Sequence, residues 1–126
     1  MIKGTGIDII EIERIENAVK NEKFIKRIFR KSEIEYFETI NNNIYTIAGS
    51  FSAKEAVVKA LGTGVRGFKW TDIEIARDKL GKPVVALYNR ANEISNEKGI
   101  VKIELSISHC KQYAIAQAIG IGDYKD

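Results

Sequence analysis

Acidic, basic and glycine residues lie close together at the end of one predicted helix. Steps of four, three and four residues place four of them on one helical face: Phe51, Glu55, Val58 and Gly62. Lys59 follows Glu55 by four residues, so these two side chains are neighbours. Gly62 can adopt the left-handed conformation that ends a helix, and Gly64 keeps the next loop open to a ligand. The group is suited to binding a phosphate, although an exposed ion pair and an ordinary helix end would show the same pattern.

A second acid, Asp8, lies between Ile7 and Ile9 in a strand predicted at residues 2–10. Alternation places the two isoleucines on one face of the strand, and Asp8 on the other face with Gly4 and Gly6. Glycine is a poor strand residue unless another segment packs closely against the backbone. The alternative interpretation of Asp8 is an aspartate at a strand end that faces water.

Asp8 and Glu55 are therefore candidate ligands of a divalent cation. Two carboxylates on partly apolar faces are costly to bury without a positive charge. Proteins bind Mg²⁺ through one or two carboxylates, and water and substrate phosphates complete its coordination. Lys59 and the backbone N–H groups of the Gly62–Thr63–Gly64 loop could contact such a phosphate. The loop follows a helix rather than preceding one, so the helix dipole does not assist anion binding there.

The elements that must position these residues predict one α+β domain over residues 1–126, with helices packed on a mainly antiparallel sheet. The longest helix is predicted at residues 44–61, with Asn43 as its N-cap. Ser32 and Glu35 have the spacing of a capping box for an earlier helix. Strands are predicted at residues 70–76, 84–88, 101–107 and 113–121, and they form two hairpins. His109 continues the inward-facing series of the third of these strands, where a structural role is the alternative to catalysis.

Basic residues crowd the segment that follows the first strand. A charge run is usually a solvated helix face. Here apolar side chains accompany the cations, which favours a docking surface for an acidic helix. The candidate docking residues are Arg14, Lys20, Lys23, Phe24 and Arg27.

Composition excludes several classes of protein. The chain has 126 residues and a formal net charge of +3, too small an excess to indicate nucleic-acid binding by itself. Cys110 is the only cysteine, which excludes a disulfide framework and a thiolate zinc site, and we expect it to be a small packed side chain. Neither a signal peptide nor an apolar run of membrane-spanning length is found. We expect a cytoplasmic protein with no membrane partner.

In their order along the chain, several motifs together resemble the holo-[acyl-carrier-protein] synthases, the short 4'-phosphopantetheinyl transferases. The resemblance covers essentially the whole chain, and the ordered set is specific although each motif alone is weak. The motifs are Gly6-Ile7-Asp8-Ile9, Phe51-Ser52-Ala53-Lys54-Glu55-Ala56, Lys59-Ala60-Leu61-Gly62-Thr63-Gly64, Asp72-Ile73-Glu74-Ile75, Gly81-Lys82-Pro83 and Ser106-Ile107-Ser108-His109.

This resemblance implies a Mg²⁺-dependent transfer of the phosphopantetheine arm of coenzyme A to a serine of apo acyl carrier protein, for fatty acid biosynthesis. Adenosine 3',5'-bisphosphate is the implied by-product, and the implied fold is that of the family. Asp8 and Glu55 match the family's metal ligands, and Lys59 matches a residue that stabilises the departing phosphate. The implied coenzyme A contacts are Lys59, Gly62, Thr63, Gly64, Lys82, Pro83, Ser108 and His109. The family also implies a homotrimer with active sites between subunits, and an acidic carrier protein docked on the basic segment.

One position departs from the family pattern: Ser50 stands where relatives usually carry a basic residue, so a phosphate or subunit contact there is in question. Two other classes remain as alternatives. A nucleic-acid-binding module would use the basic segment, but it lacks a set of stacking aromatic residues and leaves Asp8 and Glu55 unexplained. We therefore expect no nucleic-acid partner, and a steep salt dependence of DNA or RNA binding would indicate otherwise. A non-catalytic interaction subunit would need no divalent ion.

Overall fold

The structure is a computed structural model that describes residues 1–123. Its helices are α1 (Ile12–Ala18), α2 (Glu22–Ile28), α3 (Lys31–Thr39), α4 (Ile44–Leu61) and α5 (Asn89–Glu97), and a short 3₁₀ helix spans Trp70–Asp72. Its strands are β1 (Ile2–Glu11), β2 (Ile73–Arg77), β3 (Pro83–Leu87), β4 (Lys102–His109) and β5 (Tyr113–Ile121). Over the described residues, no helix is both long enough and apolar enough to span a membrane.

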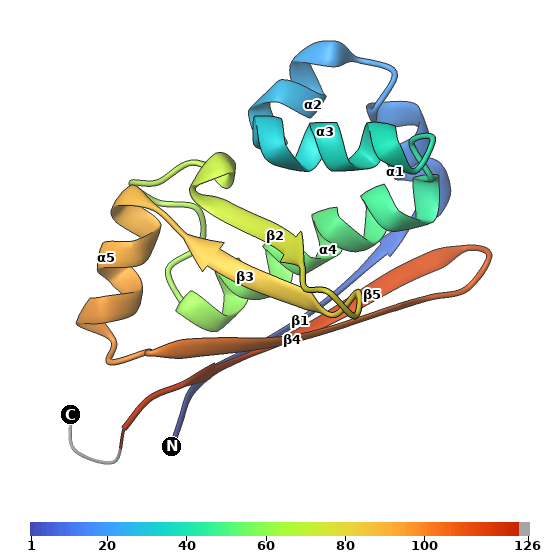
Figure 1. Cartoon of the computed structure of the whole chain (residues 1–126). Helices are drawn as coiled ribbons and strands as arrows, with labels where there is room; N and C mark the ends of the chain where they lie inside the picture. The colour runs from blue at the N-terminus through green and yellow to red at the C-terminus, as the bar shows by residue number, and fades with distance from the viewer. Residues whose placement is uncertain (124–126) are drawn as a thin grey trace.

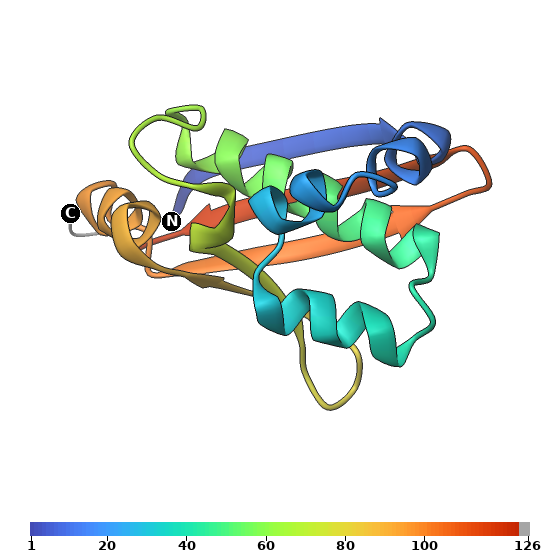
Figure 2. The same cartoon turned by 90° about the horizontal axis from the view of Figure 1, so that it is seen from above.

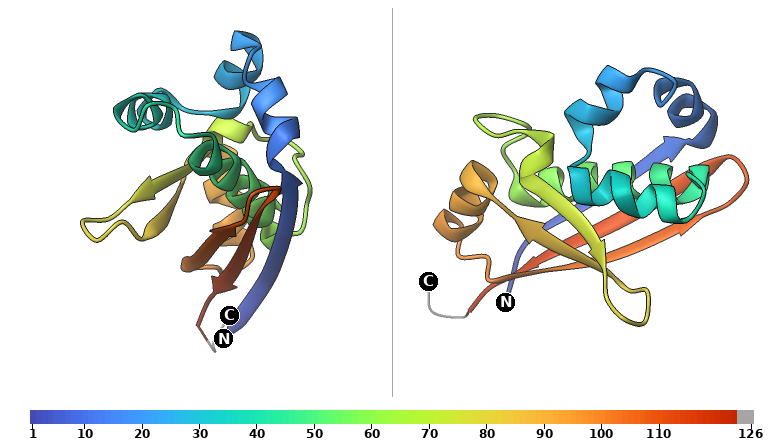
Figure 3. Two further views of the ribbon diagram at one scale, coloured as in Figure 1. Left: turned by 90° about the vertical axis from the view of Figure 1, so that its right-hand side faces the viewer. Right: turned by 45° about the horizontal axis from the view of Figure 1, so that its top comes forward.

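Two antiparallel sheets enclose the long helix α4. One sheet has the strand order β1-β5-β4, and the other is the β2–β3 hairpin. The hairpin diverges from the three-stranded sheet, and α4 lies between them, while α1, α2 and α3 cover the end of α4 where it begins (Figures 1 and 3). The predicted α+β class and both hairpins are confirmed.

Helix α4 connects the two parts of the core. Asn43 begins it by accepting hydrogen bonds from the backbone N–H groups of Tyr45 and Thr46, and Gly62 ends it with a φ of 79°. Its first half packs against the first three helices, in a cluster that includes Ile15, Phe29, Phe37, Ile47 and Phe51. Its second half packs against both sheets and α5, as Figure 2 shows from above, in a cluster that includes Val57, Leu61, Ile73, Ile94 and Leu105.

Two of the predicted local structures are wrong. The N-cap of α3 is Arg30 rather than Ser32, because the Glu33 carboxylate accepts a hydrogen bond from the Arg30 backbone N–H at 2.8 Å. Residues 70–72 form the 3₁₀ helix instead of the start of a strand, because Asp72 accepts from the backbone N–H of Lys69 at 3.1 Å. In both places an acid three residues into the element satisfies the first free N–H group.

The turn between β4 and β5 also differs from expectation. Cys110 is exposed rather than packed. His109 lies on the predicted face of its strand, opposite the buried Ala114, but it is exposed at the sheet's edge. Its ring stacks on Tyr45 of α4, with centroids 4.9 Å apart and planes at 24°. Of the tail expected to be loose, residues 124–126 lie outside the described part of the chain.

Candidate active site

Strand β1 lies directly on α4, and this contact positions Asp8. A Cβ atom on Gly4 would lie 2.1 Å from the carbonyl oxygen of Ala60, and one on Gly6 would lie 1.9 Å from that of Ala56. Two residues of β1 therefore cover about the same length as four residues of α4, because a strand advances roughly 3.3 Å per residue and a helix about 1.5 Å. The same step takes Asp8 to Ser52.

The Asp8 side chain is held where this progression predicts. The Ser52 hydroxyl donates to the Asp8 backbone carbonyl at 3.0 Å and lies 3.1 Å from its carboxylate oxygen Oδ2. Asp8 is only 8% exposed, so its charge lies on the helix-facing side of the sheet. The alternative of a water-facing aspartate is therefore wrong, and the strand glycines are explained by the close approach of α4.

Glu55 lies one turn after Ser52 on the same helix, where its carboxyl meets Asp8. Burial raises the pKa of Glu55 most, and the hydrogen bond to Asp8 and the negative charge of Asp8 raise it further, to about 7. The positive charges of Lys59 and Arg14 oppose this rise. Glu55 therefore ionises only near neutral pH, in a site that also contains the Asp8 carboxylate.

Lys59 lies beside Asp8 rather than pairing with Glu55 in the exposed ion pair that its spacing allowed. Its ammonium donates to the carbonyl oxygen of Ile7 at 2.8 Å and lies 3.4 Å from the Asp8 carboxylate. The Lys59 side chain remains 55% exposed, so its charge is accessible from solvent. Asp8, Glu55 and Lys59 therefore converge at the β1 edge of α4.

The donor set fits a hard divalent cation. Asp8 and Glu55 supply carboxylate oxygens, and burial together with the neighbouring Asp8 raises the pKa of Glu55, so a cation bound between them would relieve this strain on the charged form. Over residues 1–123, no three His, Cys, Asp or Glu side chains are grouped closely enough to hold a metal ion. Two carboxylates are nevertheless the usual protein share of a Mg²⁺ site that also binds a phosphate substrate.

The glycine loop after α4 continues the site toward α5. Gly62, Thr63 and Gly64 form one wall of a cleft of about 710 Å³. No atom lies within 4 Å of the position of a Cβ on Gly64, whose φ is 64°. The backbone of this loop is thus open to a ligand, as predicted, and Figure 2 shows the loop on the β1 side of α4.

The second group of predicted coenzyme A residues lies elsewhere in the protomer. Lys82 and Pro83 belong to the β2–β3 hairpin, and the Lys82 ammonium is 3.1 Å from Glu104 on β4. Ser108 and His109 end β4, the edge strand opposite β1. One protomer therefore does not bring these residues together with Asp8, Glu55 and Lys59.

The predicted docking residues lie on α1, α2 and the turn between them. Their four basic side chains are exposed at residues 14, 20, 23 and 27. Phe24 is half-buried, and its ring lies 5.9 Å from that of Phe51, one helical turn before Glu55 on α4. This contact joins the basic surface to the carboxylate site.

Sequence reasoning missed three buried polar residues that support the site: Ser52, Lys54 and Glu33. Lys54 is fully buried, and its ammonium donates to Glu33 at 2.7 Å, Ile28 O at 2.8 Å, Ile73 O at 2.6 Å and Trp70 O at 3.3 Å. Burial lowers the pKa of Lys54, and the charge of Glu33 opposes this. A usable signal was present, because Ser52, Ala56 and Ala60 form a row of small residues that matches the β1 glycines.

Ser50 is also buried, at 1% exposure. It is thus not at a position where its short side chain contacts a ligand on the protein surface. The family pattern has a long basic side chain at this position, and this chain lacks it.

Comparison with known proteins agrees with the geometry. The family model described as the 4'-phosphopantetheinyl transferase superfamily matches residues 4–118. The chain is 57% identical to the holo-[acyl-carrier-protein] synthase of Alkaliphilus oremlandii, over 96% of this chain and 100% of that one. The crystal structure of the synthase from Neisseria meningitidis has a TM-score of 0.87 at 34% identity, covering 96% of this chain and 99% of that one.

A synthase structure from Bacillus anthracis, described as a complex with CoA (3',5'-ADP), has a TM-score of 0.81 at 36% identity and covers 98% of this chain and 99% of that one. Both the sequence match and the structural match span nearly the whole chain. The protein therefore belongs to the 4'-phosphopantetheinyl transferase superfamily, among the holo-[acyl-carrier-protein] synthases.

Proposed function

We propose that this chain transfers the 4'-phosphopantetheine group of coenzyme A to a serine of apo acyl carrier protein, with Mg²⁺ bound by Asp8 and Glu55. The observation that carries the proposal is the convergence of these two carboxylates beside Lys59 in a chain of this family. The relatives' names specify the carrier protein, and the bound molecule of the Bacillus anthracis structure specifies coenzyme A.

The transfer forms one P–O bond and breaks another. The serine oxygen attacks the phosphorus that carries the pantetheine arm, and the bond from this phosphorus to adenosine 3',5'-bisphosphate breaks. A bound Mg²⁺ would offset the negative charge of the phosphate oxygens. The Glu55 carboxylate would accept the serine proton, directly or through a water. The exposed ammonium of Lys59 would offset the charge of the departing phosphate.

We further propose that the active site is completed between subunits of a homotrimer. Asp8, Glu55 and Lys59 lie at the β1 edge of the sheet, whereas Ser108 and His109 lie on the opposite edge strand. A ring in which the β1 edge of one protomer meets the β4 edge of the next would join the two groups. Lys82 and Pro83 would then reach the same coenzyme A molecule.

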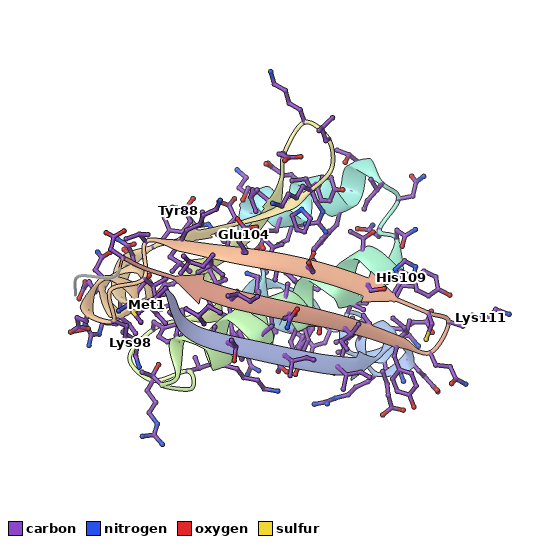
Figure 4. The ribbon with its side chains drawn as sticks, turned by 90° about the horizontal axis from the view of Figure 1, so that it is seen from below. Met1, Tyr88, Lys98, Glu104, His109 and Lys111 are labelled. Atoms are coloured by element: carbon purple, nitrogen blue, oxygen red, sulfur yellow. The ribbon has the colours of Figure 1, made fainter. Side chains whose placement is uncertain are left out.

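The outer face of the three-stranded sheet supports assembly. No other segment covers this face in the view of Figure 4. Its exposed apolar residues include Ile7 at 58%, Ile9 at 59%, Tyr113 at 41% and Ile115 at 37%. An apolar face of this kind is typical of an interaction surface. Light scattering should give the mass of three chains, and an active monomer at assay concentration would refute the trimer.

The acidic carrier protein would dock on the exposed basic residues Arg14, Lys20, Lys23 and Arg27, with Phe24 among them. The proximity of Phe24 to Phe51 supports this proposal, because Phe51 lies one turn of α4 before Glu55. A carrier bound there could present its serine to the carboxylate site. The role of these residues stays a prediction.

Intact-mass analysis tests the function directly. Apo acyl carrier protein mixed with this protein, coenzyme A and Mg²⁺ should gain the mass of one phosphopantetheine group. Omission of Mg²⁺ should prevent the gain, and a variant carrier whose serine is replaced by alanine should stay unmodified. A role in fatty acid biosynthesis, a cytoplasmic location and a single domain over residues 1–126 also stay predictions.

A further inference from the structure

The two carboxylate oxygens of Asp8 lie in different surroundings. Oδ2 is 3.1 Å from the hydroxyl of Ser52, a fully buried residue of α4. Oδ1 is 3.4 Å from the ammonium of Lys59, whose side chain is 55% exposed. One oxygen therefore faces the interface between β1 and α4, and the other faces the side that a cation can reach from solvent.

The Ser52 hydroxyl contacts the main chain of Asp8 as well as its side chain. It lies 3.0 Å from the Asp8 backbone carbonyl oxygen, and it has a single proton to share between this oxygen and Oδ2. Both distances are within hydrogen-bond range, so the hydroxyl restrains the side-chain torsions that separate the two oxygens. Ser52 itself is held by the close packing of β1 on α4. The Asp8 carboxylate is thus kept in one orientation by a residue that is itself fixed.

Close packing alone does not require a hydroxyl at residue 52. Ala56 and Ala60 continue the row of small residues along α4, and they meet the glycines of β1 without a polar side chain. The row carries an oxygen atom only at Ser52, where the facing strand residue is Asp8. A buried hydroxyl is costly unless it has a hydrogen-bond partner. The serine at this position is therefore explained by the carboxylate rather than by the approach of the strand.

We propose that Ser52 is a positioning residue that holds Asp8 as a one-oxygen ligand and so favours Mg²⁺ over Ca²⁺. The inference rests on the proposed function, in which Asp8 and Glu55 bind the divalent cation. With Oδ2 held by Ser52, Oδ1 is the oxygen of Asp8 that is available to a cation. Mg²⁺ needs a nearly ideal octahedron of oxygens, whereas Ca²⁺ accepts more oxygens and binds a carboxylate through one or both. A single restrained oxygen suits the stricter cation.

Cation titrations of the full chain test the proposal. Calorimetry gives the dissociation constants of Mg²⁺ and Ca²⁺ for the wild type, Ser52→Ala and Ser50→Ala. Ser50→Ala is the matched control, because it removes the hydroxyl of another buried serine of α4 and leaves the contacts between Ser52 and Asp8 in place. We expect Ser52→Ala to weaken Mg²⁺ binding roughly ten-fold and Ca²⁺ binding less, so that the preference for Mg²⁺ narrows. The control should match the wild type.

Two further measurements separate positioning from stability. Urea denaturation without divalent cations shows how much stability each variant loses, and Ser52→Ala should fold because alanine already occupies the next two positions of the row. In the transfer assay, Ser52→Ala should raise the Mg²⁺ concentration that gives the half-maximal rate. The KM for carrier protein should stay unchanged.

Two results would overturn the proposal. Equal Mg²⁺ affinity in Ser52→Ala and Ser50→Ala refutes it, even if Ser52→Ala is less stable in urea, because Ser52 then only packs β1 on α4. An equal loss of Mg²⁺ and Ca²⁺ affinity also refutes it, because a site that has merely loosened does not distinguish the two cations. In either case, a wild type that binds Mg²⁺ and modifies carrier protein retains the proposed function. A wild type that does neither refutes both.

Discussion

Lys54 and Glu55 are neighbours in sequence, yet their charges are treated in opposite ways. Lys54 points into the protein, where four oxygen atoms surround its ammonium and Glu33 balances its charge. Glu55 is half-buried on the other side of the helix and faces a second carboxylate, that of Asp8. The protein neutralises the charge of Lys54 through Glu33, whereas the neighbouring Asp8 carboxylate disfavours the charge of Glu55.

This difference indicates that Lys54 stabilises the fold, whereas Glu55 belongs to the candidate active site. The Lys54–Glu33 pair ties α4 to the loop before α3 and to β2, because Glu33 also accepts from the backbone N–H groups of Arg30 and Ile75. Such a network maintains the fold as long as both partners are present. The Asp8–Glu55 pair has only the partly exposed ammonium of Lys59 beside it, and the pKa of Glu55 stays raised to about 7. A site of that kind is stabilised by a ligand rather than by the fold.

The largest expected effect is on activity, at Glu55. Glu55→Gln should lower the transfer rate about a thousand-fold or more, because it removes a charged metal ligand and a proton acceptor. The unfolding temperature without Mg²⁺ should stay equal or rise, since the repulsion from Asp8 is removed. Rates come from intact-mass time courses, and Glu38→Gln, the same change at an exposed position of α3, is the control. Near-normal turnover at saturating Mg²⁺ would show that Glu55 is not a ligand.

Lys54→Met should mainly lower stability, whereas Glu55→Gln should mainly lower activity. It leaves the buried Glu33 carboxylate without a cation, so we expect a loss of about 3–5 kcal/mol in the free energy of unfolding. Urea denaturation measures this loss. The double variant Lys54→Met/Glu33→Gln should recover part of the stability, because the uncompensated charge is removed. If Lys54→Met were as stable as the wild type while transfer was lost, the comparison between residues 54 and 55 would be reversed.

The pH dependence of stability gives a smaller and more specific signal. Glu55 has a pKa of about 7 in the folded protein against an ordinary value of 4.5. Between these values the folded state binds more protons than the unfolded state, so stability falls as pH rises from about 4.5 to 7. Glu55→Gln should remove this fall. A fall of the same size in the variant would assign the effect to other groups.

Mg²⁺ should act with the opposite pH dependence. At pH 8 the Glu55 carboxyl is ionised and free to bind the cation, whereas at pH 5.5 it holds a proton. The rise in unfolding temperature produced by Mg²⁺ should therefore be larger at pH 8. Ca²⁺ and Na⁺ at equal ionic strength separate specific binding from general screening. An equal rise at both pH values would contradict a carboxylate site.

The elements of the fold were predicted from sequence where local patterns decide them. The ends of α4 and β5 follow from Asn43, Gly62 and a regular alternation, all of which act over a few residues. The wrong N-cap of α3 has a non-local cause. Glu33 is held by Lys54 and by the N–H group of Ile75, which are distant in the sequence, so Ser32 and Glu35 do not form the cap.

The sequence singled out the members of the candidate site, whose roles stay predictions, but it did not indicate their arrangement. Asp8 and Glu55 stood out as acids on apolar faces, and the family resemblance named them as ligands. That Lys59 contacts Asp8 rather than Glu55 depends on how β1 crosses α4, which no spacing within the helix indicates. The same holds for the separation of Lys82 and His109 from the carboxylates, because it depends on strand order.

The smallest expected effect extends the comparison to the basic residues of the docking surface, Arg14 and Arg27. Both are exposed, but the charge of Arg14 lowers the pKa of Glu55, so Arg14 is close to the carboxylate site, whereas Arg27 lies in the last turn of α2. Arg27→Glu should raise the apparent KM for carrier protein several-fold, on the order of 1 kcal/mol, and leave the KM for coenzyme A unchanged. The salt dependence of the KM for carrier protein should weaken in Arg27→Glu, because one attractive charge has become repulsive.

Arg14→Glu should raise the KM for carrier protein and also shift the pH profile of transfer upward, since a third negative charge beside Glu55 disfavours the ionisation of Glu55. Steady-state kinetics with each substrate varied in turn, at several pH values, separate these two effects. Identical profiles for the two variants would place Arg14 on the docking surface alone, and a pH shift with Arg27→Glu would show that this surface and the carboxylate site are not distinct.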